Sequence, residues 1–244
     1  MKKIIFLLMA AMPLFFVGCD NDDDADNNTS PNTEIDLVTM DNMQKNTKYS
    51  LLLDSKERMA IEESDVKPLP SDGQRMIAQY EFLPNTLENN ETYPVHLLAI
   101  REILTKNMEE FDPETAEDTY GNDSLKVEDI WIGGEYMNVK FSYMGESKTH
   151  FIHLIQDISQ EYEDGNIHLE LRHNADEDQQ NVSLKGMACF NIKDLLPEEE
   201  TVTFIIHAKE SAESIELYEI EYDPASISKD EREYELSEET GDIK

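Results

Sequence analysis

The sequence predicts an all-β protein whose body consists of two domains. Apolar and polar residues alternate in many short runs, as Met137, Val139, Phe141 and Tyr143 do with the polar residues between them. This period of two is typical of strands. Asp-Gly and Gly-Gly pairs separate several of these runs and are typical of tight turns. The chain has 244 residues, which is enough for two hydrophobic cores.

Four strands are expected in the N-terminal half, at residues 49–53, 59–61, 76–83 and 93–100. In the third of these, Met76, Ala78, Tyr80 and Phe82 fall on one face. The next segment, 101–110, carries apolar residues at helical spacing between β patterns, so helix and strand both stay open there.

Seven short strands are expected in the C-terminal half, and they predict an antiparallel β-sandwich. Their ranges are 127–132, 135–143, 149–156, 167–171, 183–191, 201–208 and 215–221. Gly133-Gly134 joins the first two as a hairpin turn, because glycine supplies the positive φ angles that such a turn needs. A single helical turn is expected at 194–196, just before Pro197.

The N-terminus predicts a lipoprotein. Two lysines, an apolar run at 4–17 and a small residue, Gly18, form the layout of a secretory signal peptide over residues 1–18. Phe16-Val17-Gly18-Cys19 resembles a bacterial lipobox, in which the cysteine receives a diacylglycerol and becomes the new N-terminus. We therefore expect lipidation of Cys19 and anchoring in the outer membrane.

An acidic run follows the lipidated cysteine. Its members are Asp20, Asp22, Asp23, Asp24 and Asp26. Residues 19–44 are polar and contain no glycine, so we expect a flexible tether. The run also resembles the surface-export signal of lipoproteins in some anaerobic Gram-negative bacteria. That resemblance implies display on the cell exterior, whereas the enteric rule for Asp after the cysteine implies retention at the inner membrane.

The predicted organisation has five segments. They are the signal peptide (1–18), the tether (19–44), a β-barrel domain (45–122), a β-sandwich domain (123–224) and an acidic tail (225–244). The polar stretch 112–124 is taken as the domain boundary. The tail has few apolar anchors and is expected to be frayed.

Charge limits the partners. The chain carries 54 acidic and 20 basic residues, a net charge of −34, and acidic residues are in excess in each segment of the mature chain. Nucleic acid is excluded because its recognition depends on lysine and arginine. A basic partner or divalent cations would be attracted.

No catalytic motif is present, and we predict a protein that is not an enzyme and needs no cofactor. No His-Glu-x-x-His motif, cysteine pair or Gly-x-Ser-x-Gly motif occurs. His150 and His153 lie three apart on one expected strand. This odd spacing would place the two side chains on opposite faces, so they could not bind one metal ion together. No metal site is predicted, although one built across strands stays open. Cys189, alone after lipidation of Cys19, is expected to be buried and inert.

Three further positions have both a structural and a functional interpretation. Trp131 is expected in the core rather than at a ligand surface. Arg172-His173-Asn174 is expected to be a structural corner in which Arg172 pairs with a carboxylate, with a polar recognition edge as the alternative. Asp123-Ser124-Leu125 matches a short O-glycosylation pattern, which would place a glycan on Ser124 in an exposed interdomain linker.

Several stretches together resemble the NigD-like lipoprotein family. They are 129–134, 136–141, 149–154, 169–175 and the Asp72-Gly73-Gln74-Arg75 sequence before a strand, together with the lipobox. The resemblance spans nearly all of the mature chain. It implies an N-terminal OB-like β-barrel and a C-terminal β-sandwich, and it supplies no established activity or catalytic residues.

The sequence therefore predicts a lipid-anchored cell-envelope protein that binds an unidentified protein or glycan partner. A bacteriocin-associated accessory role is one version, and it comes from the family name alone. The alternatives are a surface lipoprotein that binds or processes carbohydrate and a structural envelope component without a ligand. The oligomeric state is left open.

Overall fold

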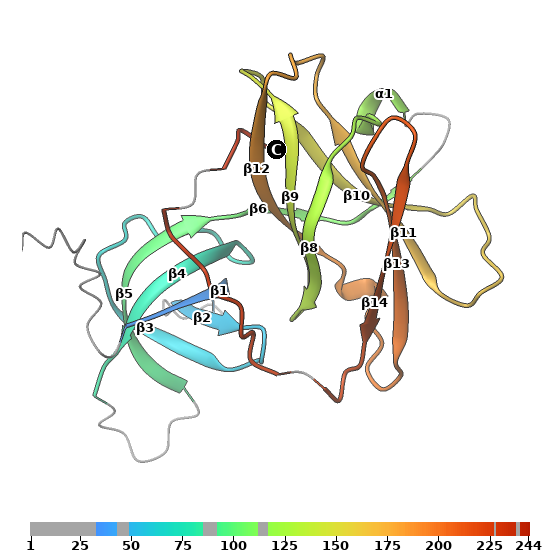
Figure 1. Ribbon diagram of the computed structural model, residues 1–244. Helices are drawn as coiled ribbons and strands as arrows, with labels where there is room; N and C mark the ends of the chain where they lie inside the picture. Colours follow the sequence, from blue (N-terminus) through green and yellow to red (C-terminus); the bar gives the residue numbers. More distant parts are fainter. Residues whose placement is uncertain (1–32, 43–48, 85–91, 112–116, 227, 238–239) are drawn as a thin grey trace, which may run out of the picture. The chain divides into compact units, whose positions relative to one another are not determined.

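The protein is all-β, with one barrel and two further sheets (Figure 1). The computed structural model describes residues 33–42, 49–84, 92–111, 117–226, 228–237 and 240–244. The signal peptide, Cys19 and the acidic residues Asp20 to Asp26 lie outside the described residues. Within the described part, no helix has the length and apolarity to cross a bilayer.

Five strands close into a barrel in the order β1-β2-β3-β5-β4. They are β1 (Thr33–Asn42), β2 (Tyr49–Leu53), β3 (Arg58–Ser64), β4 (Arg75–Phe82) and β5 (Thr92–Glu102). Neighbours are antiparallel except β3 and β5, which are parallel. This confirms the predicted barrel.

The first strand differs from the prediction, which assigned residues 19–44 to the tether. β1 pairs with both β2 and β4, and its central residues 36–40 are buried. Burial of these residues stabilises β1 in the barrel, although the predicted tether to which it belongs is mostly polar. Val38 and Met40 face the barrel core, which also contains Met76, Ala78 and Tyr80 from β4. Phe82, expected on the same face, is 41% exposed at the end of its strand.

The segment 101–110 is strand. β5 continues through Ile103 into β6 (Leu104–Asn107) and β7 (Glu109–Phe111). β6 pairs with β12 (Val182–Asn191) in one sheet, and β7 pairs with β10 (Phe151–Asp157) in the other. The chain thus enters the sandwich at Ile103, well before the predicted boundary at 122, because these residues form ladders with sandwich strands.

The sandwich is confirmed, but its sheets are mixed rather than antiparallel throughout. One sheet has the order β14-β13-β11-β10-β7 and the other β6-β12-β9-β8. The remaining strands are β8 (Lys126–Gly133), β9 (Tyr136–Gly145), β11 (Ile167–Asn174), β13 (Val202–Lys209) and β14 (Ile215–Tyr222). β11 and β13 are parallel because the chain crosses through β12 in the opposite sheet between them.

Two short helical elements complete the domain. They are α1 (Glu117–Tyr120) and the 3-10 turn η1 (Lys193–Leu195), which confirms the expected helical turn before Pro197 within one residue. The sandwich core contains Phe141, Phe190 and Phe204, which are fully buried. In the hairpin between β8 and β9, only Gly134 has a positive φ, of 57°, whereas Gly133 belongs to β8.

The C-terminal segment, residues 228–237 and 240–244, packs against the body. Tyr234 is 7% exposed. Ile243 forms a parallel bridge with His150, and the Ile152 amide donates to the Lys244 carbonyl at 2.8 Å. The expectation of a frayed tail is wrong for these residues because they bury aromatic and aliphatic side chains and form backbone hydrogen bonds.

Candidate functional site

The barrel meets the sandwich in a hydrophobic cluster, here called the junction cluster. Its buried members are Leu37, Ile77, Ile103, Trp131, Tyr136, Met187, Cys189 and Tyr234. They come from the barrel, the sandwich and the C-terminal segment. Trp131 is 6% exposed and Cys189 is fully buried, so both predicted core assignments are confirmed. Burial raises the pKa of the Cys189 thiol to about 11, which keeps it protonated and unreactive.

A buried ion pair lies beside this cluster. The Arg75 guanidinium donates to both Asp54 carboxylate oxygens, at 2.6 and 3.0 Å, and to Thr39 Oγ1 and Asn138 Oδ1, at 3.1 and 3.2 Å. The Arg75 side chain is completely buried. Burial alone would lower its pKa, but the adjacent Asp54 carboxylate more than offsets that effect and the pKa lies above its usual value. Asn138 belongs to β9, so the pair links the barrel to the sandwich.

Gly133 allows the barrel to approach the β8–β9 hairpin this closely. A Cβ atom added at Gly133 would lie 2.0 Å from Asp54 Oδ2, which is inside contact distance. The two glycines that the sequence predicts as a turn therefore have different structural roles. Gly134 makes the turn, and Gly133 makes room for the Asp54 carboxylate.

An open groove of about 680 Å³ lies next to this contact. We call it the junction groove, and its lining residues are Asp54, 130–134, 219–223, Ser226 and 228–232. Its walls are the edge strand β8 of one sheet, the end of β14 from the other sheet, and the C-terminal segment. Its carboxylates are Asp54, Glu219, Glu221, Asp223, Asp230 and Glu231, against two cations, Lys229 and Arg232. The groove is therefore an acidic surface that attracts cations.

The two groove cations are already engaged. Arg232 donates to Asp129 at 2.9 Å and to Asp230 at 3.1 Å, and it lies over the Trp131 ring at 4.1 Å. Lys229 lies 3.8 Å from Asp36. The Trp131 ring is thus covered on the groove side by a guanidinium rather than open for stacking with a ligand.

A second polar array lies inside the sandwich, where strand pairing brings His150 of the β9–β10 connection next to His173 of β11. His150 Nδ1 is 2.7 Å from His173 Nε2, and His150 Nε2 is 3.2 Å from Asp178 Oδ2. His173 Nδ1 is 3.0 Å from the Ser124 carbonyl. Both imidazoles are at most 1% exposed.

These contacts fix the positions of the protons. The Ser124 carbonyl only accepts, so His173 Nδ1 carries a proton. Burial lowers the pKa of His173 to about 4, so at neutral pH its Nε2 is an acceptor and His150 Nδ1 must donate to it. Burial acts to raise the pKa of Asp178, but the Glu146 amide and His150 hold it below its usual value, so Asp178 is ionised. His150 Nε2 therefore faces a carboxylate that can only accept a hydrogen bond.

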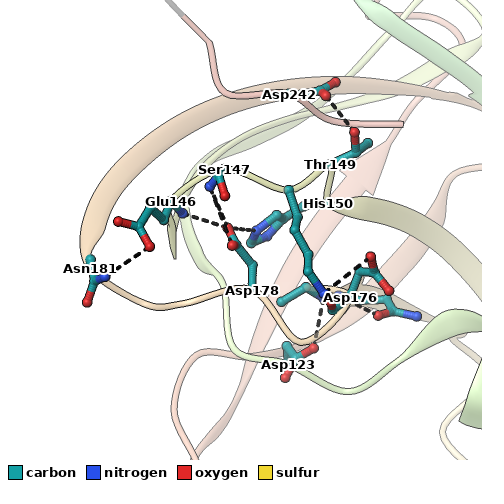
Figure 2. A network of polar contacts seen from close by, with 12 residues as sticks. Asp123, Glu146, Ser147, Thr149, His150, Asp176, Asp178, Asn181 and Asp242 are labelled. Atoms are coloured by element: carbon teal, nitrogen blue, oxygen red, sulfur yellow. Dashed lines mark hydrogen bonds and ion pairs between the residues drawn. The ribbon is translucent and has the colours of Figure 1, made fainter.

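This array is a structural clamp. The Asp178 carboxylate also accepts from the Glu146 and Ser147 amides, at 2.6 and 3.1 Å, and so orders the loop before β10 (Figure 2). The His150 amide donates to the Asp242 carbonyl at 2.9 Å, which attaches the C-terminal segment to the same place. The array joins three segments, and no nucleophile belongs to it.

The buried neutral imidazole predicts loss of stability in acid. In the unfolded chain His173 takes up a proton near pH 6.5, whereas in the folded chain its pKa is about 4. The unfolded state therefore binds more protons between these values, and stability falls as the pH drops. We expect the free energy of unfolding to decrease by about 2 kcal/mol between pH 7 and pH 5. Denaturant titrations at several pH values measure this.

The matched variant is His173→Gln, for which the same titrations should give a clearly smaller slope with pH. A residual slope is expected because burial also lowers the pKa of His153 and His207. An unchanged slope in the variant would refute the assignment of the effect to His173.

A second imidazole pair lies on the other face of the same sheet. His168 Nδ1 is 2.9 Å from His207 Nε2, and Asp164 accepts from His168 Nε2 at 2.9 Å. Tyr162 stacks on His168 with a centroid distance of 3.5 Å. Strand register could have revealed both pairs, but spacing within one strand does not. Among the described residues, no three histidine, cysteine or acidic side chains converge in a way that could hold a metal ion.

The remaining sequence-predicted positions fall in structural surroundings. Arg172 donates to Glu170 at 2.7 Å, which confirms the expected pairing with a carboxylate. Ser124 is half-buried, and its segment is held by a hydrogen bond from the Asp123 amide to the His173 carbonyl at 2.8 Å. It is therefore part of the sandwich and not an exposed interdomain linker, and its glycosylation stays a prediction. Cys19 and the acidic run lie outside the described residues.

Comparisons with known proteins agree with this architecture. Residues 37–103 match the NigD-like N-terminal OB domain and residues 107–222 match the NigD-like C-terminal beta sandwich domain. A search of curated proteins gave no match.

Three solved structures with the same fold come from Parabacteroides and Bacteroides species. A proposed toxin-related protein of Parabacteroides distasonis is 26% identical, with a TM-score of 0.65 over 79% of this chain and 94% of that one. A NigD-like immunity protein of Bacteroides caccae is 16% identical, with a TM-score of 0.57 over 78% and 97%. A proposed lipoprotein of Bacteroides fragilis is 14% identical, with a TM-score of 0.53 over 80% and 100%.

Both halves of the body match the corresponding family domains, in the order that the structure shows. The chain is a member of the NigD-like family, with its OB domain followed by its β-sandwich domain.

Proposed function

We propose that this chain is a non-enzymatic, lipid-anchored cell-envelope protein that binds a partner protein at the cell exterior. The observation that carries the binding role is the junction groove, an open acidic surface of about 680 Å³ built by both sheets and the C-terminal segment. The Arg75–Asp54 pair and the junction cluster hold Asp54 and Trp131, which line one side of it. A charged, open groove suits recognition of another macromolecule.

The proposed lipid anchor and the proposed location at the cell surface are supported by the sequence. The lipobox with Cys19 supports lipidation, and the acidic run after it supports surface export. The B. fragilis neighbour, described as a proposed lipoprotein, is consistent with an anchored protein. A bacteriocin-associated accessory role is the narrower version, supported by the description of the B. caccae neighbour as an immunity protein.

Photo-cross-linking on intact cells tests the proposal. A photoreactive amino acid at Glu221, in the groove, should give one discrete adduct, whereas the same amino acid at Glu63, exposed on barrel strand β3, should not. Protease added to intact cells should destroy the adduct. A variant with Asp22, Asp23, Asp24 and Asp26 all changed to Ala should be protected, because it lacks the export signal.

Three results would contradict the proposal. The same cross-linked adducts at Glu221 and Glu63, or no adduct at either position, would favour a structural envelope component. Protection of the wild-type chain from protease would place the body in the periplasm. Turnover in an oligosaccharide hydrolysis screen that one carboxylate change abolishes would favour the carbohydrate-processing alternative.

A further inference from the structure

β14 is the open edge of its sheet. It pairs with β13 along its whole length, and the part of the chain that the structure describes supplies no second neighbour. Soluble proteins usually protect such edges with lysine, proline or a bulge. The eight residues of β14, IELYEIEY, contain no lysine or proline, and the register with β13 runs without a shift from Ile215 to Tyr222. The charged residues of β14 are all glutamates, which repel an acidic strand but not a basic one, so the edge is open to pairing with a basic strand.

The register identifies the amides that face outward. The Glu210 amide donates to the Ser214 carbonyl at 3.2 Å, which makes these two a hydrogen-bonded pair. Such pairs alternate along an antiparallel ladder, so Ile215, Leu217, Glu219 and Glu221 turn their backbone groups away from β13. Lys209 is the partner of Ile215 in this register, so its backbone groups should also face away from the neighbouring strand. Its carbonyl does so, because it accepts from the Leu125 amide at 3.0 Å rather than from β14.

The side chains of the same residues define the chemistry of the edge. Tyr218, Ile220 and Tyr222 pack on the sandwich core, and the residues between them point outward. Ile215 and Leu217 are 63% and 61% exposed, which is high for aliphatic side chains. Beyond them come Glu219 and Glu221, and β14 itself contains no basic residue.

The edge is continuous with the junction groove, because residues 219–222 belong to both. A strand laid along β14 would meet Ile215 and Leu217 first and then enter the acidic groove. Pairing with β14 of a second copy would place the glutamates of two such strands close together, and like charges facing each other across a ladder are destabilising. The complementary occupant is an extended segment whose side chains on that one face are aliphatic beside Ile215 and Leu217 and basic beside Glu219 and Glu221.

We propose that the free edge of β14 binds an extended, basic segment of the partner protein as an added strand. The proposal rests on the partner-binding function above and names the chemistry of the partner. Main-chain hydrogen bonds to the outward amides provide the affinity of such additions, and side chains provide the selection. Here Ile215 and Leu217 select aliphatic residues, while Glu219 and Glu221 select lysine or arginine.

Binding of synthetic peptides to the full chain in detergent tests this proposal. The probe is a nine-residue peptide of threonine with lysine at positions 2 and 4 and isoleucine at positions 6 and 8, which places lysines beside Glu221 and Glu219 and isoleucines beside Leu217 and Ile215 in an antiparallel pairing. Its controls are the same peptide N-methylated at alternate residues, which keeps the charge and removes strand donors, and a peptide with glutamate in place of lysine. We expect saturable binding of the first peptide only, and its affinity should fall with added salt.

Variants separate the contribution of the backbone from that of charge. Glu219→Pro removes an outward amide and leaves the ladder with β13 intact, so the affinity should fall about tenfold or more. Glu219→Gln with Glu221→Gln keeps the amides and should lower it about fivefold, mainly at low salt. Glu62→Gln with Glu63→Gln on β3 makes the same change in net charge and should have no effect.

Equal binding of the N-methylated peptide, or equal loss in the β3 variant, would overturn strand addition in favour of general charge attraction. A concentration-dependent dimer that Glu219→Pro abolishes would overturn it in favour of a second copy. If no peptide binds while the groove still gives its adduct on cells, this inference fails and the proposed function stands. If the peptide binds and no adduct forms on cells, the inference about β14 stands and the proposed function fails.

Discussion

Replacing Arg75 by methionine is expected to destabilise the protein by about 3–5 kcal/mol, the cost of leaving a buried charge without its partner. The Asp54 residue is 6% exposed and would keep its carboxylate without the two hydrogen bonds from the guanidinium. Because Arg75 also donates to Asn138, the loss should loosen the contact between barrel and sandwich. Thermal and denaturant unfolding measure the effect, and the melting temperature should fall by about 10 °C.

Two variants make this result specific. Arg58→Met breaks the barrel ion pair with Asp41, in which the two side chains are 39% and 23% exposed, and it should cost about 1 kcal/mol or less. Arg75→Met combined with Asp54→Asn removes both charges and should be clearly more stable than Arg75→Met alone. Equal losses for Arg75→Met and Arg58→Met would show that the junction does not depend on the buried pair.

Replacing Tyr234 by alanine is expected to cost about 3–5 kcal/mol, as is usual for truncation of a buried large aromatic side chain. Its ring belongs to the junction cluster and lies 5.0 Å from the Lys140 ammonium group. Hydrogen exchange should also become faster in residues 228–237, since the ring is the main buried anchor of that segment.

The companion variant is Tyr234→Phe, which keeps the ring and removes only the hydrogen bond from the hydroxyl to Asp230. It should cost about 1–2 kcal/mol, and most of the loss would then belong to ring packing. If Tyr234→Ala left both stability and exchange unchanged, the C-terminal segment would behave as the frayed tail that its composition suggests.

Most of the strands could be predicted because their pattern is local. Alternation such as Met137, Val139, Phe141 and Tyr143 records which face of a strand is buried. The sequence pattern does not predict β1, because its apolar residues lie in a highly acidic context and it gains its burial only after pairing with β2 and β4. The segment 101–110 stayed open because its hydrophobic side chains serve different sheets, which gives neither a clean period of two nor a clean helix.

The parts of the site depend on contacts across the fold. Arg75 and Asp54 are 21 residues apart, and His150 and His173 are 23 apart. Their pairing follows from strand order, which composition and spacing do not encode. Gly133 shows the same limit, since its glycine-glycine pair predicts a turn, whereas the need for a missing side chain comes from Asp54 in the other domain.

The direct passage from β5 into β6 and β7 has a consequence for how the protein is inherited. A recombination break between Leu104 and Phe111 would separate β6 from β12 or β7 from β10, and a break after Tyr222 would remove the C-terminal segment that returns to the junction cluster. Exchange of either domain at such a break would leave strand edges unpaired. We expect descendants of this gene to keep the barrel and the sandwich together as one heritable unit, and to diverge at the edge of β14, where a new partner can be acquired without disturbing either core.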